Sequence, residues 1–431
     1  MTARSGLVDA TAPELSPGGS MLVESADHEP EVNLDYAATT PALQATLDAV
    51  AAFLPHYGSV HRGGGRRSAR STEAYESARR TVAEFVGCPP GGSVIFVRNT
   101  TEAANLLAAA LPPGSRVLCS PFEHHANLLP WRIHRVAHLP FTSSADALVA
   151  AVEAALDEAR SAGDPFDLLA ISGASNVTGE VTPLAELASA AQHRGARVFV
   201  DAAQLAPHRR IDIGASGVDF LAFSGHKLYA PFGTGALILK DDLLADGLPL
   251  LRGGGAVKLV SLEDVAWADS PHRYEAGTPN TVGAIALAAA CSALSELGMA
   301  CIENEERRLA ERLWAEIGQI PGVELLRMWE GAPDRVGVAT FTIEGRDPRL
   351  VAEALATRFR IAVRSGAFCA HPLLAHLLGV GQAEVAALFE HVDREGSVRV
   401  PGAVRASIGI GVTDADIDRL LTAVDAIARS G

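Results

Sequence analysis

The stretch "DFLAFSGHKLYAPFGTGALIL", Asp219–Leu239, decides the fold that the rest of the chain is expected to adopt. An apolar run, Phe220–Phe223, ends in Ser-Gly-His-Lys, and a second apolar run follows the glycines at 233 and 235. Ammonium groups are rarely placed next to a buried strand without a function. The stretch therefore predicts two strands joined by a loop that carries a functional lysine.

Further short apolar runs resemble these two and predict more strands of the same sheet. Helical stretches over 145–160 and 183–194 separate several of them, and another helix begins near Ser71. Short, continuously apolar strands that alternate with helices are typical of a largely parallel sheet covered on both faces. The expected strands cover 94–97, 116–119, 167–171, 197–200, 219–223 and 235–239.

The pattern changes after about residue 300, where a second, α+β lobe is expected. A charged helix over 302–318 is followed by a strand over 336–344 and a helix near 348–358, and a last helix begins at Asp414. A chain of 431 residues exceeds what one hydrophobic core usually serves, so two lobes are the expectation. Residues 1–30 have the composition of a disordered leader, and of neither a signal nor a transit peptide.

Charge and cysteine usage narrow the class of protein. The formal charge of −15 argues against nucleic acid or an anionic membrane as the main partner, and no run is apolar and long enough to span a membrane. The five cysteines are irregularly spaced and form no CxxC pair, which makes a disulfide framework or a zinc site unexpected and fits a cytoplasmic protein.

Residues that follow the predicted strands suggest a cofactor. An arbitrary lysine is most often a surface residue, but Lys227 follows a buried strand, and a sheltered lysine can lose its proton and form a Schiff base with pyridoxal 5′-phosphate, PLP. Asp201 after the 197–200 strand could hold the pyridine nitrogen, or merely cap a turn. Gln204 could bond the ring hydroxyl. His124 suits a stacking role, although one of His124 and His125 is also compatible with a structural role.

A phosphate needs backbone N–H groups at the start of a helix together with hydroxyl donors. Thr100 and Thr101 open an Ala-rich helix in "NTTEAAN", which fits this need and fits an ordinary N-cap equally well. Ser224 and His226 could add donors from the other side.

Eight segments in order along the chain resemble the cysteine desulfurase and selenocysteine lyase group of class V aminotransferase-like, fold type I PLP enzymes. They are "NLDYAATTP", "VHRGGGRRSARSTEAYESARR", "TTEAANLL", "EHHANLLPW", "VDAAQLAPH", "DFLAFSGHKLYAPFGTGAL", "YEAGTPN" and "VRASIGI". The resemblance implies a large PLP domain over 46–299 and a small domain formed by 31–45 together with 300–431. It also implies a homodimer.

The resemblance assigns roles position by position. Lys227 would carry PLP, and Asn176 and Arg405 would bind the amino-acid substrate, Arg405 through a two-pronged bond to its carboxylate. Thr278 would reach the partner's phosphate across the dimer interface. The other cofactor contacts implied are Thr101, His124, Asp201, Gln204, Ser224 and His226. Arg62 and His61, in the first glycine cluster, either approach the partner's cofactor or are solvated loop residues.

Cys369 in "VRSGAFCAHPLL" is the expected sulfur-handling residue. A buried structural cysteine is the usual case, but Arg364 and His371 are near in sequence and would favour the thiolate. In the resembling enzymes a cysteine here takes the substrate sulfur as a persulfide and alanine is released. The chain departs from them in having Phe368 before the cysteine, where many have His, and in a long segment before Arg405. The other four cysteines are expected to be structural.

The leading expectation is thus a PLP-dependent desulfurase acting on L-cysteine or a related sulfur or selenium amino acid, with a possible protein sulfur acceptor. A PLP-dependent C–S β-lyase, epimerase or aminotransferase on the same fold is the alternative. A non-catalytic binding or sulfur-carrying protein is a third reading, which the presence of Lys227, Asp201 and Arg405 disfavours.

Overall fold

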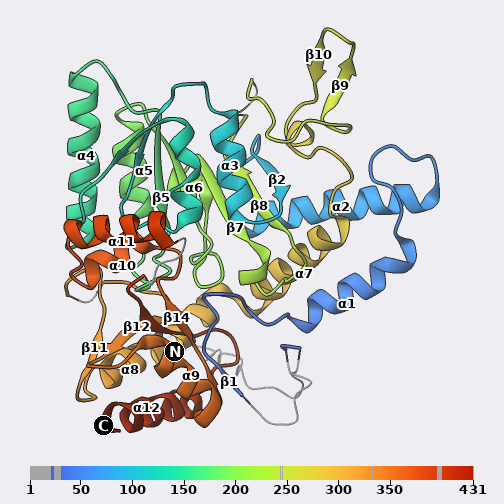
Figure 1. The fold of residues 1–431 in the computed structure, drawn as a ribbon. Coiled ribbons are helices and arrows are strands. Elements are labelled where there is room, and N and C mark those ends of the chain that lie inside the picture. The colour runs from blue at the N-terminus through green and yellow to red at the C-terminus, as the bar shows by residue number, and fades with distance from the viewer. Residues whose placement is uncertain are drawn as a thin grey trace, which may run out of the picture.

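The computed structural model describes residues 21–23, 31–242, 244, 246–331, 333–395 and 400–430 (Figure 1). The expected leader, residues 1–30, lies outside the described residues except for 21–23. These three residues pair with the start of α1 (Gln44–Phe53), since the Val23 N–H donates to Ala42 O and the Gln44 N–H donates to Met21 O, both at 2.9 Å.

The central sheet confirms the expected α/β fold. Its seven strands lie in the order β2-β8-β7-β6-β5-β3-β4. β8 runs antiparallel to both of its neighbours and every other adjacent pair is parallel. The strands are β2 (Ser93–Val97), β3 (Arg116–Cys119), β4 (Arg135–His138), β5 (Leu168–Ser172), β6 (Arg197–Asp201), β7 (Phe220–Ser224) and β8 (Gly235–Leu239).

Helices cover both faces of this sheet, as the continuously apolar strands predict. Side chains of α3 pack with one set of strand residues, and those of α4, α5 and α7 pack with the alternate set. α2 begins earlier than expected, and the sequence pattern predicted neither α7 nor β4. The helices are α2 (Arg66–Phe85), α3 (Thr100–Ala110), α4 (Ala145–Ser161), α5 (Leu184–Gln192), α6 (Ile213–Ser216) and α7 (Thr281–Leu297).

The stretch Asp219–Leu239 forms β7, the 3-10 turn η4 (Gly225–Lys227) and β8. The two strands pair antiparallel from Phe220 opposite Leu239 to Ser224 opposite Gly235. A Cβ atom at Gly225 would lie 2.4 Å from Thr234 O, so only glycine fits where the chain leaves β7. The lysine is therefore held at the carboxyl end of a buried strand.

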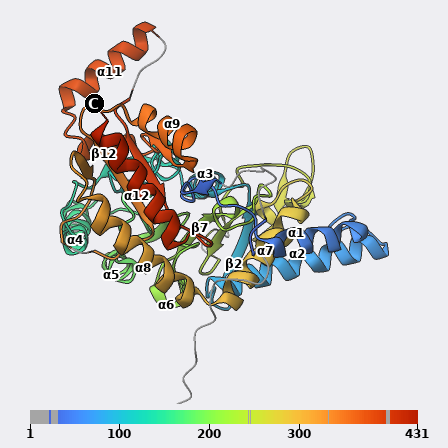
Figure 2. The ribbon, with the colours of Figure 1, turned by 90° about the horizontal axis from the view of Figure 1, so that it is seen from below.

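A second sheet, antiparallel and of four strands in the order β11-β12-β15-β14, forms the core of the α+β part. α8 and α12 lie side by side against it (Figure 2). β1 (Val32–Asn33) pairs with β13 (Ile361–Ala362). The other elements are β11 (Val323–Leu325), β12 (Val338–Ile343), β14 (Arg364–Gly366), β15 (Ala403–Ser407), α8 (Met299–Ile317), α9 (Pro348–Phe359), α10 (His371–Leu377), α11 (Gln382–Glu395) and α12 (Asp414–Arg429). The domain boundaries at 46 and 299 stay predictions.

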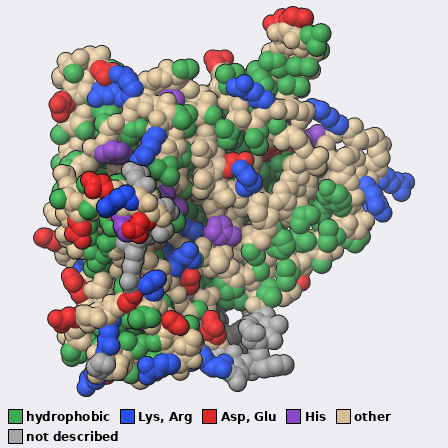
Figure 3. Space-filling view, viewed as in Figure 1, with side chains coloured by type: hydrophobic (Ala, Val, Ile, Leu, Met, Phe, Trp, Pro, Cys, Tyr) green, Lys and Arg blue, Asp and Glu red, His purple; other side chains and the backbone are tan. Residues whose placement is uncertain are grey.

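A hairpin of β9 (Val257–Val260) and β10 (Val265–Trp267) projects from the molecule (Figure 1). Hydrophobic side chains gather on it in the space-filling view (Figure 3), and Leu259, Val260 and Leu262 are among its exposed apolar residues. In the described part of the chain no single helix has the length and apolarity to cross a membrane. α7 and α8 meet those criteria only as a pair that bends by 76°.

A buried polar contact joins the two parts of the molecule. Glu306 on α8 accepts a hydrogen bond from the backbone N–H of Gly337 and lies 2.8 Å from Nδ1 of His208, which follows β6. Glu306 and His208 are both buried. Removing one partner of a buried pair leaves the other without a partner in a place that water cannot reach.

We predict that Glu306→Ala lowers the free energy of unfolding by about 3–5 kcal/mol, because it leaves His208 buried and unpaired. Glu305→Ala is the matched control, since Glu305 is exposed and pairs with Arg308 on the surface, where an ion pair contributes about 1 kcal/mol or less. Urea unfolding followed by circular dichroism measures both. If both variants lowered the free energy of unfolding by the same amount, the stabilising role of the buried Glu306–His208 contact would be refuted.

Candidate active site

One cavity of about 200 Å³ brings together all but one of the predicted site residues. It lies where β5, β6 and β7 end, which is where ligands bind in open parallel sheets. The predicted residues that line it are Thr100, Thr101, His124, Asn176, Asp201, Gln204, Ser224, His226, Lys227, Cys369 and Arg405. The strand-end pattern predicts that the residues from Thr100 to Lys227 meet here, and the resemblance adds Cys369 and Arg405, which lie more than 200 positions from Thr100.

Lys227 lines this cavity and is partly buried. Burial lowers the pKa of Lys227 to about 8, with the positive charge of Arg405 acting in the same direction and the carboxylate of Asp201 opposing it. No described residue hydrogen-bonds the amine. Lys227 therefore loses its proton far more readily near physiological pH than an ordinary lysine does, which favours its neutral, nucleophilic form.

Asp201, at the end of β6, is fully enclosed, and burial raises its pKa, although the N–H of Ala203 and the charge of Lys227 oppose this. Gln204 is held by its amide nitrogen, which donates to Ala37 O at 2.7 Å. His124 has a pKa lowered to about 3, chiefly by burial and then by Lys227. Its Nδ1 accepts from the Ala126 N–H at 3.0 Å, so the neutral ring carries its hydrogen on Nε2.

The N-terminus of α3 faces the cavity. The Thr100 N–H donates to Ser224 Oγ at 2.9 Å, and the hydroxyl groups of these two residues lie 2.8 Å apart. The Glu102 N–H donates to the side chain of Asn99 at 3.1 Å, so Asn99 caps the helix. The start of α3 is therefore an ordinary N-cap as well as a candidate phosphate site. This leaves the first-turn N–H of Thr101 for an anion. His226 lies beside Thr39, at 3.2 Å from its hydroxyl oxygen.

Arg405 enters the cavity from β15 of the second sheet and is almost fully buried. Its Nη1 donates to Asn176 O at 2.8 Å, and its Nη2 lies 3.3 Å from Asp35 Oδ1. Its Nε is buried without a hydrogen-bond partner among the described residues. Burial lowers its pKa to about 10, against the effect of Asp35. The buried Nε is a donor that an incoming carboxylate could satisfy.

The sequence reasoning missed Asp35, although "NLDYAATTP" was one of the motifs that carried the resemblance. Asp35 also lies 3.7 Å from Arg364 Nη1, so one carboxylate faces two guanidinium groups. The motif places an acidic residue in the N-terminal segment. The pairing of that segment with β13 and β15 then brings the Asp35 carboxylate next to Arg405.

Three contacts hold the loop that carries Cys369. Asn176 Nδ2 donates to Phe368 O at 2.7 Å, and the His125 N–H donates to Cys369 O at 2.7 Å. The Arg405 guanidinium lies 4.9 Å from the centre of the Phe368 ring. The role of Asn176 therefore includes fixing this loop. Phe368, the departure from the resembling enzymes, packs on the residue expected to bind substrate.

The backbone of the same loop is strained. Phe368 and Cys369 have φ values of 52° and 54°, in the left-handed region that non-glycine residues rarely adopt. Each such residue costs about 1–3 kcal/mol, and such residues cluster at functional sites. Cys369 is exposed. Among the other cysteines, Cys119 and Cys291 are buried, as expected of structural residues.

Thr278 does not line the Lys227 cavity. It lines a second cavity of about 610 Å³ together with His61, Arg62 and Gly255. Thr278 therefore lines a different cavity from the other predicted site residues, and its predicted role across a dimer interface stays a prediction.

Comparison with known proteins identifies the family. The family model for class-V aminotransferases matches residues 32–420. A cysteine desulfurase of Yersinia pseudotuberculosis is 34% identical over 95% of this chain and 96% of its own length. A probable cysteine desulfurase of Mycolicibacterium paratuberculosis is 35% identical over 95% of this chain, which spans only 57% of that protein.

A solved structure agrees with these relatives. The apo structure of the cysteine desulfurase from Thermococcus onnurineus superposes with a TM-score of 0.80 at 29% identity, covering 93% of this chain and 95% of that one. The fold, the shared cavity and the match over nearly the whole chain agree, and we conclude that this chain is a member of the class-V aminotransferase family of PLP-dependent enzymes, similar along its length to cysteine desulfurases.

Proposed function

We propose that this protein is a PLP-dependent cysteine desulfurase, which transfers sulfur from L-cysteine to Cys369 and releases alanine. The observation that carries the proposal is one cavity lined by a lysine of lowered pKa, a buried aspartate, a buried arginine and an exposed cysteine on a strained loop. Relatives named as cysteine desulfurases support it.

The residues present fit PLP. Lys227 offers an amine without a hydrogen-bond partner among the described residues, and Asp201 offers a buried carboxylate for a pyridinium nitrogen. His124 offers a neutral ring for stacking. The N–H of Thr101, which no described residue accepts, offers donors for a phosphate together with the hydroxyls of Thr100 and Ser224. When bound, PLP would supply an electron-accepting ring that stabilises negative charge at the α-carbon of an amino acid.

Arg405 would hold the substrate carboxylate through its Nε and Nη2, which together form a two-pronged donor. Lys227, once its amine is free, would take the α-proton as a general base, for which a pKa near 8 is suited.

Cys369 would act as the nucleophile on sulfur. Its thiolate would attack the substrate sulfur, so that an S–S bond forms and the substrate Cβ–S bond breaks. The electron pair of the broken bond stays with the carbon skeleton, which takes up a proton and leaves as alanine. The persulfide sulfur would then pass to an acceptor, for which the exposure of Cys369 leaves room.

A homodimer is part of the proposal. Thr278 lies outside its own chain's cavity, and exposed apolar residues lie on the β9–β10 hairpin. Both features fit a surface that meets a second copy, with Thr278 reaching the phosphate site of that copy.

The first prediction concerns Cys369. Cys369→Ala should lower sulfide and alanine production from L-cysteine with a reductant by about 100-fold or more, because the nucleophile is removed. Cys301→Ala, at a partly buried cysteine on α8, is the matched control and should keep full activity. Full turnover by Cys369→Ala with pyruvate and ammonia as products would favour a C–S β-lyase instead.

The second prediction concerns Lys227 and pH. Only the neutral amine captures an aldehyde, so capture of PLP by the apoprotein should rise with pH and level off above about pH 8. With a lysine of ordinary pKa, the captured fraction would continue to rise up to about pH 10. Borohydride reduction and peptide mapping measure the capture. Lys227→Ala should give no pyridoxyl label and Lys258→Ala, at an exposed site, full labelling; a label at another position would refute the assignment.

The third prediction concerns Asp35, whose carboxylate contacts the Arg405 Nη2 that the substrate carboxylate would also bind. Asp35→Asn should lower KM for L-cysteine by roughly fivefold, equivalent to about 1 kcal/mol, because a competing negative charge is lost. Asp48→Asn on α1 is the exposed control. A rise in KM would mean that Asp35 holds Arg405 in place and does not compete with substrate.

A further inference from the structure

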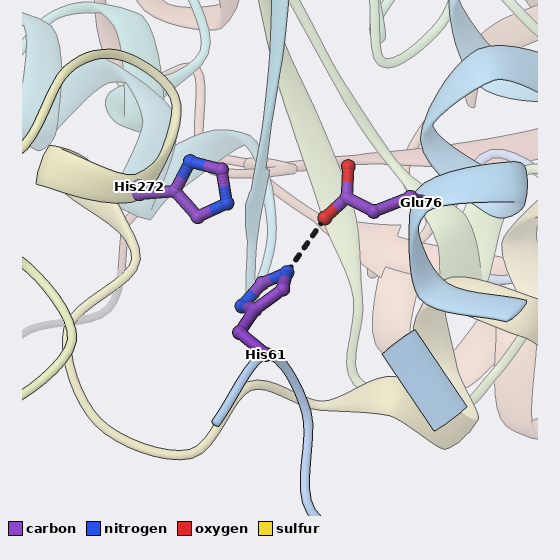
Figure 4. A group of neighbouring side chains, drawn as sticks. All are labelled: His61, Glu76 and His272. Carbon is purple, nitrogen blue, oxygen red and sulfur yellow. Dashed lines mark hydrogen bonds and ion pairs between the residues drawn. The ribbon is translucent and has the colours of Figure 1, made fainter. Parts of the chain in front are cut away.

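Three side chains outside the Lys227 cavity, His61, Glu76 and His272, converge on one point (Figure 4). Their ligand atoms all lie within 4.8 Å of one another. His61 Nε2 is 2.8 Å from Glu76 Oε1, and the ring centres of the two histidines are 4.7 Å apart. The three residues come from the loop before α2, from α2 itself and from η5 (His272–Tyr274).

Two imidazoles and one carboxylate are a common donor set for zinc and related divalent ions, with a fourth position left for water or another ligand. Donor atoms around a tetrahedral zinc ion lie about 3.3 Å apart, so an adjustment of about 1.5 Å would close the site. Rotation of the exposed His61 ring can supply it.

The surroundings hold the donors in place. Arg79 Nε donates to Glu76 Oε2 at 3.0 Å and Arg79 Nη2 donates to Glu76 Oε1 at 3.3 Å, so this fork fixes the carboxylate while Oε1 still faces His61. Arg79 also pairs with Glu275 at 2.7 Å, so two carboxylates outweigh its positive charge near the cluster. Such hydrogen bonds to a ligating carboxylate are typical of metal sites.

The backbone of His61 is also unusual. Its φ of 69° lies in the left-handed region, and its N–H donates to Thr72 Oγ1 at 2.7 Å. A non-glycine residue persists there only when its surroundings enforce it. The loop is thus bent so that the His61 ring meets Glu76.

We propose that His61, Glu76 and His272 bind one divalent transition-metal ion of the zinc type per chain, with its open position facing the second cavity, which His61 and His272 line. No zinc site was expected from the sequence, because that expectation rested on the cysteines alone, and these three ligands lie too far apart along the chain to form a motif. The ion would pin the loop that carries Arg62 to α2 and η5.

The test is a titration of the PLP-loaded full-length protein, freed of affinity tag and treated with a chelator, with Co²⁺ and then Zn²⁺. It is run in a Cys369→Ala background so that the active-site thiol binds no metal. We expect one Co²⁺ per chain with the visible bands of a tetrahedral site, displaced by Zn²⁺. Glu76→Gln and His272→Phe should each weaken binding by about 10–100-fold.

The chain offers matched controls. Glu73→Gln, one turn earlier on α2 in an exposed pair with Arg80, and His193→Ala, on the surface, should leave binding unchanged. Circular dichroism and pyridoxal absorbance check that each variant folds. If Glu76→Gln or His272→Phe does not fold, His61→Ala, at an exposed position, takes its place in the titration. Absence of saturable binding, or binding that persists in both ligand variants, would overturn the proposal. Neither result depends on turnover.

Discussion

The site depends on the buried guanidinium of Arg405 and on the contacts that stabilise its charge. A charged group this deeply buried is stable only when partners satisfy it. Those partners come from distant parts of the chain: Asp35 from the N-terminal segment, the Asn176 carbonyl from the loop after β5, and the Phe368 ring from the cysteine loop. Three segments that no local pattern joins are thereby brought around one side chain.

The same constraint explains why the cavity combines nucleophilic and cationic groups. Lys227, which follows a strand of the central sheet, and Arg405, on the second sheet, line one cavity, where burial lowers the pKa of both and the charge of Arg405 further lowers that of Lys227. The carboxylate of Asp201 opposes the shift of Lys227, and that of Asp35 opposes the shift of Arg405. An amino-acid carboxylate entering here would meet the positive charge of Arg405 beside an amine that loses its proton more readily than an ordinary lysine, which is the combination that amino-acid chemistry on an aldehyde cofactor requires.

Much of the large sheet and of the candidate site could be predicted from sequence. Continuously apolar runs set the strands 116–119, 197–201, 220–224 and 235–239 within one residue, because burial on both faces leaves a strand no polar positions. β4 was missed since its residues are partly exposed and lack that signal. The Ala-rich α7 was missed since it has little amphipathic contrast.

The sequence by itself determined that a lysine, an aspartate and a helix N-terminus would meet, since parallel strands bring their carboxyl ends to one edge. It could not determine the pairing of Asp35 with Arg405, the left-handed backbone of Phe368 and Cys369, or the meeting of His61, Glu76 and His272. These depend on how the second sheet, the N-terminal segment and the loops pack against one another. Such contacts join residues far apart in the chain and leave no periodic trace in it, so only the tertiary structure decided them.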